Sequence, residues 1–181
     1  MKMLESSPES EKAALSVEDT GGVYCVTAFT GLGAPYWNPY TRGTIVGITR
    51  GTKKEHLIRA VLEAMAYQTQ DLIELMEKES EIEITSVKVD GGATANDFLM
   101  QFQSDISRKQ VVRPACIETT AMGAAFLAGI ATGFWKDTDE IKLCVEEGRQ
   151  FTPAMPEENR QELLKGWKRA VKCALAWADA E

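Results

Sequence analysis

The sequence predicts an α/β protein in which a largely parallel sheet is covered by helices, and three observations lead to this expectation. Short β-branched segments alternate along the chain with segments of helical periodicity, which is the order that builds parallel sheets. Of the 181 residues, 44% are hydrophobic and 26% are charged, which is typical of a globular chain and not of a disordered one. We find no internal repeat and no linker after residue 22, so a single domain is expected from there on.

The N-terminal part of the chain contains a polar segment, two strands and a loop. Residues 1–22 are polar and acidic with weak apolar spacing, and we expect a polar linker or a short solvated helix. The β-rich residues 23–29 and 44–49 predict two strands. Residues 30–43 combine glycines, two prolines and three aromatic residues, a composition that predicts an ordered loop without regular structure.

The strongest helical pattern covers residues 53–79. Its apolar residues recur every three or four positions: Leu57, Ile58, Val61, Leu62, Met65, Leu72, Ile73 and Met76. Thr52 is expected to cap this helix, with Glu55 as its partner in a capping box. The one histidine of the chain, His56, lies beside Glu55 and is expected to be a partly exposed surface residue.

The rest of the chain continues the alternation of strands and helices. The predicted elements are a strand at 84–89, a helix at 95–107, a strand at 110–113, a small-residue helix at 121–133, a short helix at 137–145 and an amphipathic helix at 156–178. This order gives the expected fold its parallel strands and the helices that cover them.

Composition excludes several classes of protein. The 27 acidic residues outnumber the 20 Lys and Arg and give a formal net charge of -7, which argues against a nucleic-acid partner. No apolar run reaches the roughly 18 residues that a membrane span needs, and no secretory signal is visible. The four cysteines are scattered without a CxxC pair, so we expect reduced thiols in a cytoplasmic protein.

The best candidate for a binding site is the turn Asp90-Gly91-Gly92-Ala93, between a predicted strand and a predicted helix. Ligands of open α/β sheets bind beyond the C-terminal ends of the strands, and glycines let a flat ligand or a phosphate approach the backbone. The following helix offers unpaired N–H groups and the positive end of its dipole, and Asn96 has a donor and an acceptor for a base or a ribose. The alternative is that the two glycines form only a tight turn.

Other candidate motifs are weaker. The chain has no P-loop and no HExxH motif, and Tyr36 stands where the third glycine of a dinucleotide fingerprint belongs. Asp90 is a possible Mg²⁺ ligand or base, although the expectation is that it accepts hydrogen bonds within the turn. The small residues of 121–133 predict close helix packing. The alternative is that the start of this helix, Glu118-Thr119-Thr120, borders a nucleotide cleft.

Four stretches of the chain resemble bacterial glycerol kinases of the FGGY carbohydrate kinase family: TAFTGLGAPYWNPYTRGTIVGITRGTKKEHLIRAVLEAMAYQTQDL, VKVDGGATANDFLMQFQSDI, ETTAMGAAFLAGIATGFW and GWKRAVKCALAW. The resemblance runs from about Gly22 to Ala178, and the TGLGAPYW…RG loop distinguishes glycerol kinases from most other sugar kinases of the family. Small departures are Thr27 in place of proline, Asn38 in place of aspartate and Asp97 in place of a frequent asparagine.

The resemblance implies an actin/hexokinase-like (ribonuclease H-like) ATPase fold with a mixed sheet flanked by helices, incomplete in this chain. Residues 23–181 would then be part of the C-terminal kinase domain, without its first strands. The resemblance also implies ATP and Mg²⁺ as cofactors. It places Gly91, Gly92 and Ala93 against the adenosine and phosphates, and Asn96 on the adenine side.

The same resemblance places the glycerol-binding residues, the catalytic aspartate and the phosphate-binding hairpin in a longer N-terminal part. Glycerol would therefore be contacted only through that part, and no catalytic or metal-binding residue is expected within these 181 residues. The chain alone is expected to be inactive, and a homo-oligomer is expected. Two alternatives stay open: a non-catalytic nucleotide-binding or assembly module, and part of a related sugar kinase, against which the loop 30–43 argues.

Overall fold

The computed structural model describes residues 3–145 and 148–178. The strands are β1 (Tyr24–Val26), β2 (Thr44–Val46), β3 (Ser86–Lys88), β4 (Gln110–Arg113) and β5 (Arg149–Phe151). The helices are α1 (Glu9–Leu15), α2 (Lys54–Ser80), the 3₁₀ helix η1 (Gly92–Ala95), α3 (Asp97–Ser107), α4 (Thr119–Thr132), α5 (Thr138–Cys144) and α6 (Glu157–Ala178). The α/β class and the helices expected from periodicity are confirmed.

The strands form two small sheets. β1 and β2 are an antiparallel hairpin in which Cys25 faces Ile45. β4 lies between β3 and β5 and pairs parallel with β3 and antiparallel with β5. The sheet is thus mixed, as the resemblance implied, and the expectation of one largely parallel sheet from the order of elements is wrong. β5 was not predicted because its three residues, Arg-Gln-Phe, carry no β-branched signal.

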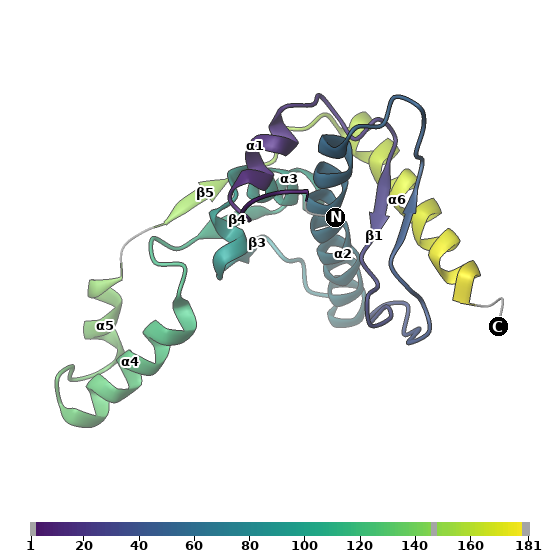
Figure 1. Ribbon diagram of the computed structural model, residues 1–181. Helices are drawn as coiled ribbons and strands as arrows, with labels where there is room; N and C mark the ends of the chain where they lie inside the picture. The colour runs from purple at the N-terminus through teal and green to yellow at the C-terminus, as the bar shows by residue number, and fades with distance from the viewer. Residues whose placement is uncertain (1–2, 146–147, 179–181) are drawn as a thin grey trace.

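The elements stack in successive layers (Figure 1). α3 packs on β4 and β5, α2 packs on α3, and the β1–β2 hairpin lies between α2 and α6. α1 packs against α2 and α3, where Ala14 is fully buried and Arg59 Nη1 donates to the carbonyl oxygen of Val17 at 2.7 Å. The polar N-terminal segment therefore includes a helix that is anchored to the body.

Aromatic side chains join these layers in the core. Trp167 of α6 is fully buried and stacks on Tyr67 of α2, with ring centroids 5.3 Å apart. Tyr67 in turn makes an edge contact with Phe102 of α3, at 5.5 Å between centroids. Such pairs add stability beyond the area they bury. They fix α6 to α2 and α2 to α3.

A buried carboxylate fastens the loop 30–43 to the same core. Asp71 of α2 accepts hydrogen bonds from the hydroxyl of Tyr36 at 2.8 Å and from Nε1 of Trp167 at 2.7 Å. Burial raises the pKa of Asp71, and these two donors partly oppose that rise. Within the loop, the backbones of Leu32 and Asn38 exchange hydrogen bonds of 2.8 and 2.9 Å. The prediction of an ordered loop is confirmed.

The start of α2 differs from the expectation. Lys53 is the N-cap residue, and its N–H donates to Nδ1 of His56 at 3.0 Å. His56 thus takes the role that was expected of Glu55, and it is half-buried. The hydroxyl of Thr52 instead accepts from the N–H of Thr49 at 2.9 Å, which places it in the preceding turn.

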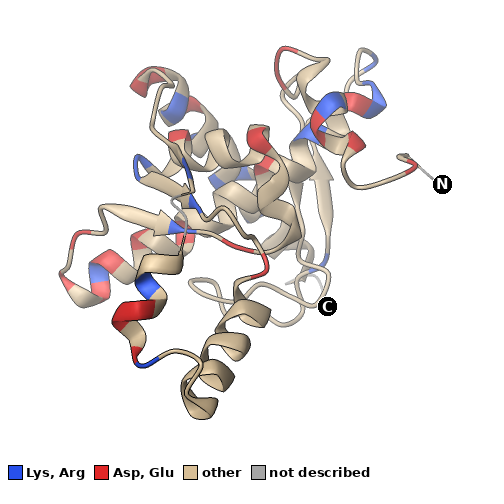
Figure 2. Ribbon diagram, turned by 90° about the vertical axis from the view of Figure 1, so that its left-hand side faces the viewer, with Lys and Arg blue, Asp and Glu red and all other residues tan. Residues whose placement is uncertain are grey.

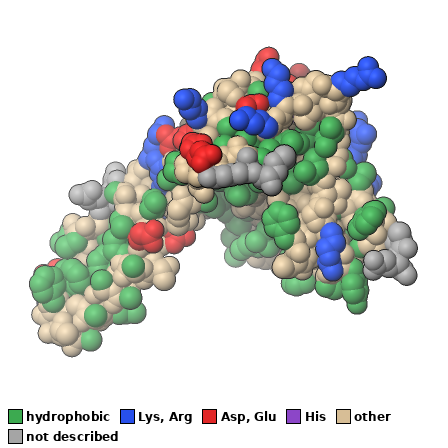
Figure 3. Space-filling view, in the orientation of Figure 1, with side chains coloured by type: hydrophobic (Ala, Val, Ile, Leu, Met, Phe, Trp, Pro, Cys, Tyr) green, Lys and Arg blue, Asp and Glu red, His purple; other side chains and the backbone are tan. Residues whose placement is uncertain are grey.

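α4, α5 and the turn between them (residues 119–144) project from the body as an arm (Figure 1). Within the arm, Gly129 packs against Trp135, and Trp135 contacts Phe126 at 5.4 Å between ring centroids. Most other residues of α4 are exposed, so the expected close packing of this small-residue helix is wrong for most of its length. Apolar side chains, including Leu127, Phe134 and Leu143, give the arm its hydrophobic surface (Figure 3).

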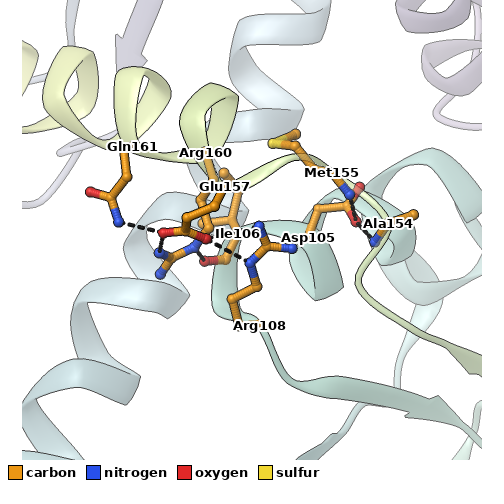
Figure 4. A network of polar contacts seen from close by, with 8 residues as sticks. All are labelled: Asp105, Ile106, Arg108, Ala154, Met155, Glu157, Arg160 and Gln161. Atoms are coloured by element: carbon orange, nitrogen blue, oxygen red, sulfur yellow. Dashed lines mark hydrogen bonds and ion pairs between the residues drawn. The ribbon is translucent and has the colours of Figure 1, made fainter.

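A polar network connects the end of α3 to the start of α6 (Figure 4). Glu157 accepts from Arg108 Nη2 at 2.8 Å, from Arg160 Nη1 at 3.0 Å and from Gln161 Nε2 at 2.5 Å. Arg160 Nε also donates to the carbonyl oxygen of Ile106 at 2.6 Å, which satisfies an acceptor near the C-terminal end of α3. The network adds polar contacts to the packing between α3 and α6.

Glu157→Gln is expected to destabilise the chain at neutral pH. The hydrogen bonds from Gln161 and Arg108 hold the pKa of Glu157 at about 2. Since this folded-state pKa lies below the ordinary value, the carboxylate stabilises the fold above that ordinary value, and the contribution is lost as the pH falls toward 2. Urea midpoints at pH 7, 5 and 3 should therefore show a gap between wild type and variant that narrows with acid.

The neighbouring Glu158 provides the control for that experiment. It lies in the same first turn of α6 and is exposed. Glu158→Gln is expected to shift the neutral urea midpoint less than Glu157→Gln does. A gap for Glu157→Gln that stays constant down to pH 3 would contradict the role assigned to its carboxylate.

Candidate functional site

The site begins at the end of β3 with residues 90–93, which we call the glycine turn. β3 and β4 run parallel, and the N–H of Val89 still donates to the carbonyl oxygen of Val112 at 3.1 Å just before the turn. Gly91 has φ 84° and ψ 169°, a conformation that residues with a Cβ rarely adopt. η1 and then α3 follow directly. The sequence predicted this arrangement of strand, turn and helix.

The glycine turn is tied to the start of α4. The N–H of Gly91 donates to the carbonyl oxygen of Ile117 at 2.9 Å, and the hydroxyl of Thr119 donates to the carboxylate of Asp90. Asp90 therefore accepts a hydrogen bond from α4, and not from within the turn as was expected. The first residues of α4 lie beside the glycine turn, so the segments that follow the two parallel strands meet at one edge. Sequence reasoning placed Thr119 at a helix start but missed its contact with Asp90.

The glycine turn presents an open backbone surface. A Cβ added at Gly91 or Gly92 would meet no other atom within 4 Å, and Gly92 and Ala93 are exposed. The turn itself is held firmly, because Thr94 is buried and its N–H and hydroxyl donate to the carbonyl oxygen of Gly91 at 3.0 and 2.7 Å. A flat or anionic ligand can therefore lie against the backbone without displacing a side chain.

The expectation that α3 offers unpaired N–H groups is wrong at its start, because Phe98 N–H donates to Glu11 at 3.1 Å and Leu99 N–H to Asn96 at 2.9 Å. η1 and α4 are the other helices that begin at this edge. The amides of Gly92 and Ala93 precede the first intrahelical bond of η1, which Thr94 makes. α4 has no side-chain cap at Glu118, and no charged residue occurs along its length (Figure 2). Unpaired N–H groups and the positive ends of helix dipoles favour an anionic ligand.

Asn96 has a structural role that was not predicted. It is the N-cap residue of α3, and its Oδ1 accepts from the N–H of Leu99 at 2.9 Å. Its Nδ2 lies 3.4 Å from the hydroxyl of Ser10 in α1. Contacts with α1 and α3 therefore fix the orientation of the amide. Because the contact of Nδ2 with Ser10 is long, Nδ2 is the group that can exchange this contact for one with a ligand.

Metal ligands and thiols are not gathered at this edge. Within residues 3–145 and 148–178, no group of three or more His, Cys, Asp or Glu lies close enough to hold a metal ion. Cys25 is buried and free, and Cys116, Cys144 and Cys173 are exposed and free. Of the helices in the described part of the chain, none is both long and apolar enough to cross a membrane.

Comparison with known proteins relates this chain to one family. The family described as "FGGY family of carbohydrate kinases, C-terminal domain" matches residues 2–132. The glycerol kinase of Lachnoclostridium phytofermentans is 62% identical over 178 residues, which cover 98% of this chain and 36% of that protein. The glycerol kinase of Clostridium botulinum (strain 657 / Type Ba4) is 56% identical over 181 residues and is also covered to 36%. The chain thus spans about a third of the length of these curated relatives.

Solved structures show the same relationship in three dimensions. The crystal structure of Plasmodium falciparum glycerol kinase with ADP matches with a TM-score of 0.84 and 32% identity, over 96% of this chain and 35% of that one. The ligand-bound xylulose kinase of Lactobacillus acidophilus matches with a TM-score of 0.76 and 22% identity, over 98% of this chain and 36% of that one. The second likeness shows the fold alone.

Proposed function

The chain belongs to the FGGY family of carbohydrate kinases, which have the actin/hexokinase-like fold, and from this we propose that it is the nucleotide-binding part of a glycerol kinase. The whole enzyme would transfer the terminal phosphoryl group of ATP to glycerol and release ADP and glycerol 3-phosphate. The observation that carries the proposal is the open backbone of the glycine turn at an edge where helix N-termini meet.

In this proposal, Gly91, Gly92 and Ala93 contact the adenosine and phosphates, and Asn96 contacts the adenine side. Gly92 lets the nucleotide approach the backbone because no side chain occupies the space above it. The amides of the glycine turn and the N-terminal end of α4 stabilise the phosphates electrostatically. Electrostatic stabilisation of this kind is a main form of catalysis in phosphoryl transfer. The Plasmodium relative whose structure holds ADP supports the choice of ligand.

We propose that Mg²⁺ accompanies the nucleotide and is not held by the described residues of this chain. Mg²⁺ prefers several oxygen ligands in octahedral geometry. Asp90 is the carboxylate of the glycine turn, and it already accepts the hydroxyl of Thr119. The described residues gather no group of three or more His, Cys, Asp or Glu that could hold the ion by themselves, and we assign no step to the ion here.

Calorimetry with the 181-residue chain and millimolar ATP or ADP tests the proposal. We expect weak binding by the wild type and a loss of about tenfold or more in affinity for Gly92→Val, because the valine fills the space of the ligand. Gly123→Val in α4 is the matched control, since Gly123 also has no atom within 4 Å of an added Cβ and should leave the affinity unchanged. Absence of heat with wild type would refute nucleotide binding by this chain, and equal affinities for wild type and Gly92→Val would refute the glycine turn as the nucleotide site.

The same chain is expected to form no ADP in response to glycerol. In the proposal, the catalytic base and the glycerol contacts belong to the rest of the enzyme. The chain alone would therefore bind the nucleotide but would not transfer its phosphoryl group. A coupled assay for ADP, with and without glycerol, measures this. Glycerol-dependent ADP formation by the purified chain would overturn the assignment of those groups to another part.

Three further properties are proposed on the same basis. We propose a division into residues 1–22 and a C-terminal kinase domain at 23–181, with α1 of the first part anchored on α2. The four free thiols support a cytoplasmic location.

The exposed Leu127, Phe134 and Leu143 of the arm support self-association. Sedimentation velocity at increasing protein concentration would reveal it. A sedimentation coefficient that stays that of a monomer would contradict it.

A further inference from the structure

Arg113, the last residue of β4, reaches across to the segment that follows the glycine turn. Its Nη1 donates to the carbonyl oxygen of Thr94 at 2.6 Å and to Oδ1 of Asp97 at 2.9 Å. Thr94 lies in η1, and Asp97 directly follows Asn96. One guanidinium therefore holds the chain on both sides of Asn96. The side chain of Arg113 is 16% exposed and that of Asp97 is 37% exposed, so the guanidinium is largely shielded while the carboxylate reaches water.

A rigid support fixes the position of this guanidinium. Phe151 of β5 is buried, and the guanidinium carbon of Arg113 lies 5.4 Å from the centre of its ring. Arg149 lies 4.8 Å from the same ring and forms a second ion pair with Asp97. Both arginines thus share Phe151 and Asp97, but Arg113 is the one that also holds the backbone of η1 through Thr94. Arginine stacked on an aromatic ring and hydrogen-bonded at two acceptors cannot be replaced equally by lysine.

Charge adds a second reason for this arrangement. Asp97 is one residue from Asn96, and an unpaired carboxylate there would add negative potential beside a site that we propose for an anionic ligand. Arg113 and Arg149 together more than balance its charge.

We propose that Arg113 is a positioning residue of the nucleotide site. By holding Thr94 and Asp97, it fixes the spacing between Gly92 and Asn96, the two ends of the surface on which the nucleotide would lie. This inference rests on the proposed function. Arg149 balances charge but does not fix that spacing, which makes it the matched control.

Hydrogen exchange of the free chain tests the positioning itself. Arg113→Ala is expected to increase exchange of the amides of residues 92–96 by about tenfold or more, while amides of α2 and α6 keep their rates. Arg149→Ala is expected to leave exchange at 92–96 within about twofold of wild type. Equal exchange at 92–96 in wild type and Arg113→Ala, or a uniform rise over the whole chain, would overturn the inference whether or not a nucleotide binds.

Calorimetry with ADP then tests the consequence. Arg113→Ala is expected to lower the affinity for ADP by about tenfold. Arg113→Lys is expected to lower it less, because lysine can still donate to one of the two acceptors. Arg149→Ala is expected to lower the affinity for ADP by less than about threefold. Raised exchange at 92–96 with unchanged ADP affinity would refute a role in the nucleotide site. A wild type without ADP heat would instead refute the proposed function, and the exchange result would still decide whether Arg113 holds the turn.

Discussion

Trp167→Ala is expected to lower the free energy of unfolding by about 3 to 5 kcal/mol, which is the range for truncating a large buried aromatic side chain. Trp167 is fully buried: it stacks on Tyr67, lies in the central apolar cluster and donates to Asp71. Its removal leaves a cavity between α2 and α6 and takes a hydrogen bond from a buried carboxylate. Both the cavity and the lost hydrogen bond lower the free energy of unfolding.

Urea unfolding of wild type, Trp167→Ala and Trp177→Ala measures this effect. Trp177 lies on the same helix but is 68% exposed, so its replacement is expected to change stability by less than about 0.5 kcal/mol. Trp167→Phe keeps an aromatic ring but not the N–H, and it should fall between the two by losing the bond to Asp71. Similar losses for Trp167→Ala and Trp177→Ala would show that the stack does not hold α6 in place.

Gly47→Ala is expected to destabilise the chain by about 2 to 5 kcal/mol through two effects that add. Gly47 follows β2 with φ 83°, where an alanine is strained. Its added Cβ would also collide with the carbonyl oxygen of Gly22, which belongs to the backbone and cannot rotate away. The collision lies beside the β1–β2 hairpin, so the hairpin must open or shift on α2.

Gly22→Ala separates the two effects. Gly22 also has a positive φ, 79°, but an added Cβ there meets nothing within 4 Å. Gly22→Ala should therefore lower the free energy of unfolding only by the backbone strain, which is about 1 to 2 kcal/mol. Chemical unfolding of both variants gives the comparison. If Gly47→Ala loses no more than Gly22→Ala, the close approach of the two backbone segments is not a constraint on the fold.

The fold was predictable where the chain has a long periodic pattern. α2 and α6 begin and end within a residue or two of their expected bounds, because several turns of apolar spacing define each of them. Strand pairing was not predictable, because strands of three or four residues carry too little pattern to specify a partner. The exposure of α4 was missed for a related reason: small residues are compatible with close packing but do not require it.

The candidate site was predictable at its centre and not at its edges. Gly91 and Gly92 between a strand and a helix are a local signal. Arg113 and Thr119 act through contacts with residues 16 or more positions away, and only the paired strands bring them together. The N-cap role of Asn96 was predictable, because asparagine just before an apolar helix is a frequent N-cap residue.

The attachment of α4 to the glycine turn makes the arm a lever. α4 has 14 residues and therefore a length of about 21 Å, with its near end bonded to Asp90 through Thr119. A rotation of about 10° at that end would carry the far end of α4 through roughly 4 Å. A movement beside Gly91 that turned α4 would therefore displace Phe134, which follows the far end of α4, more than it displaces Thr119.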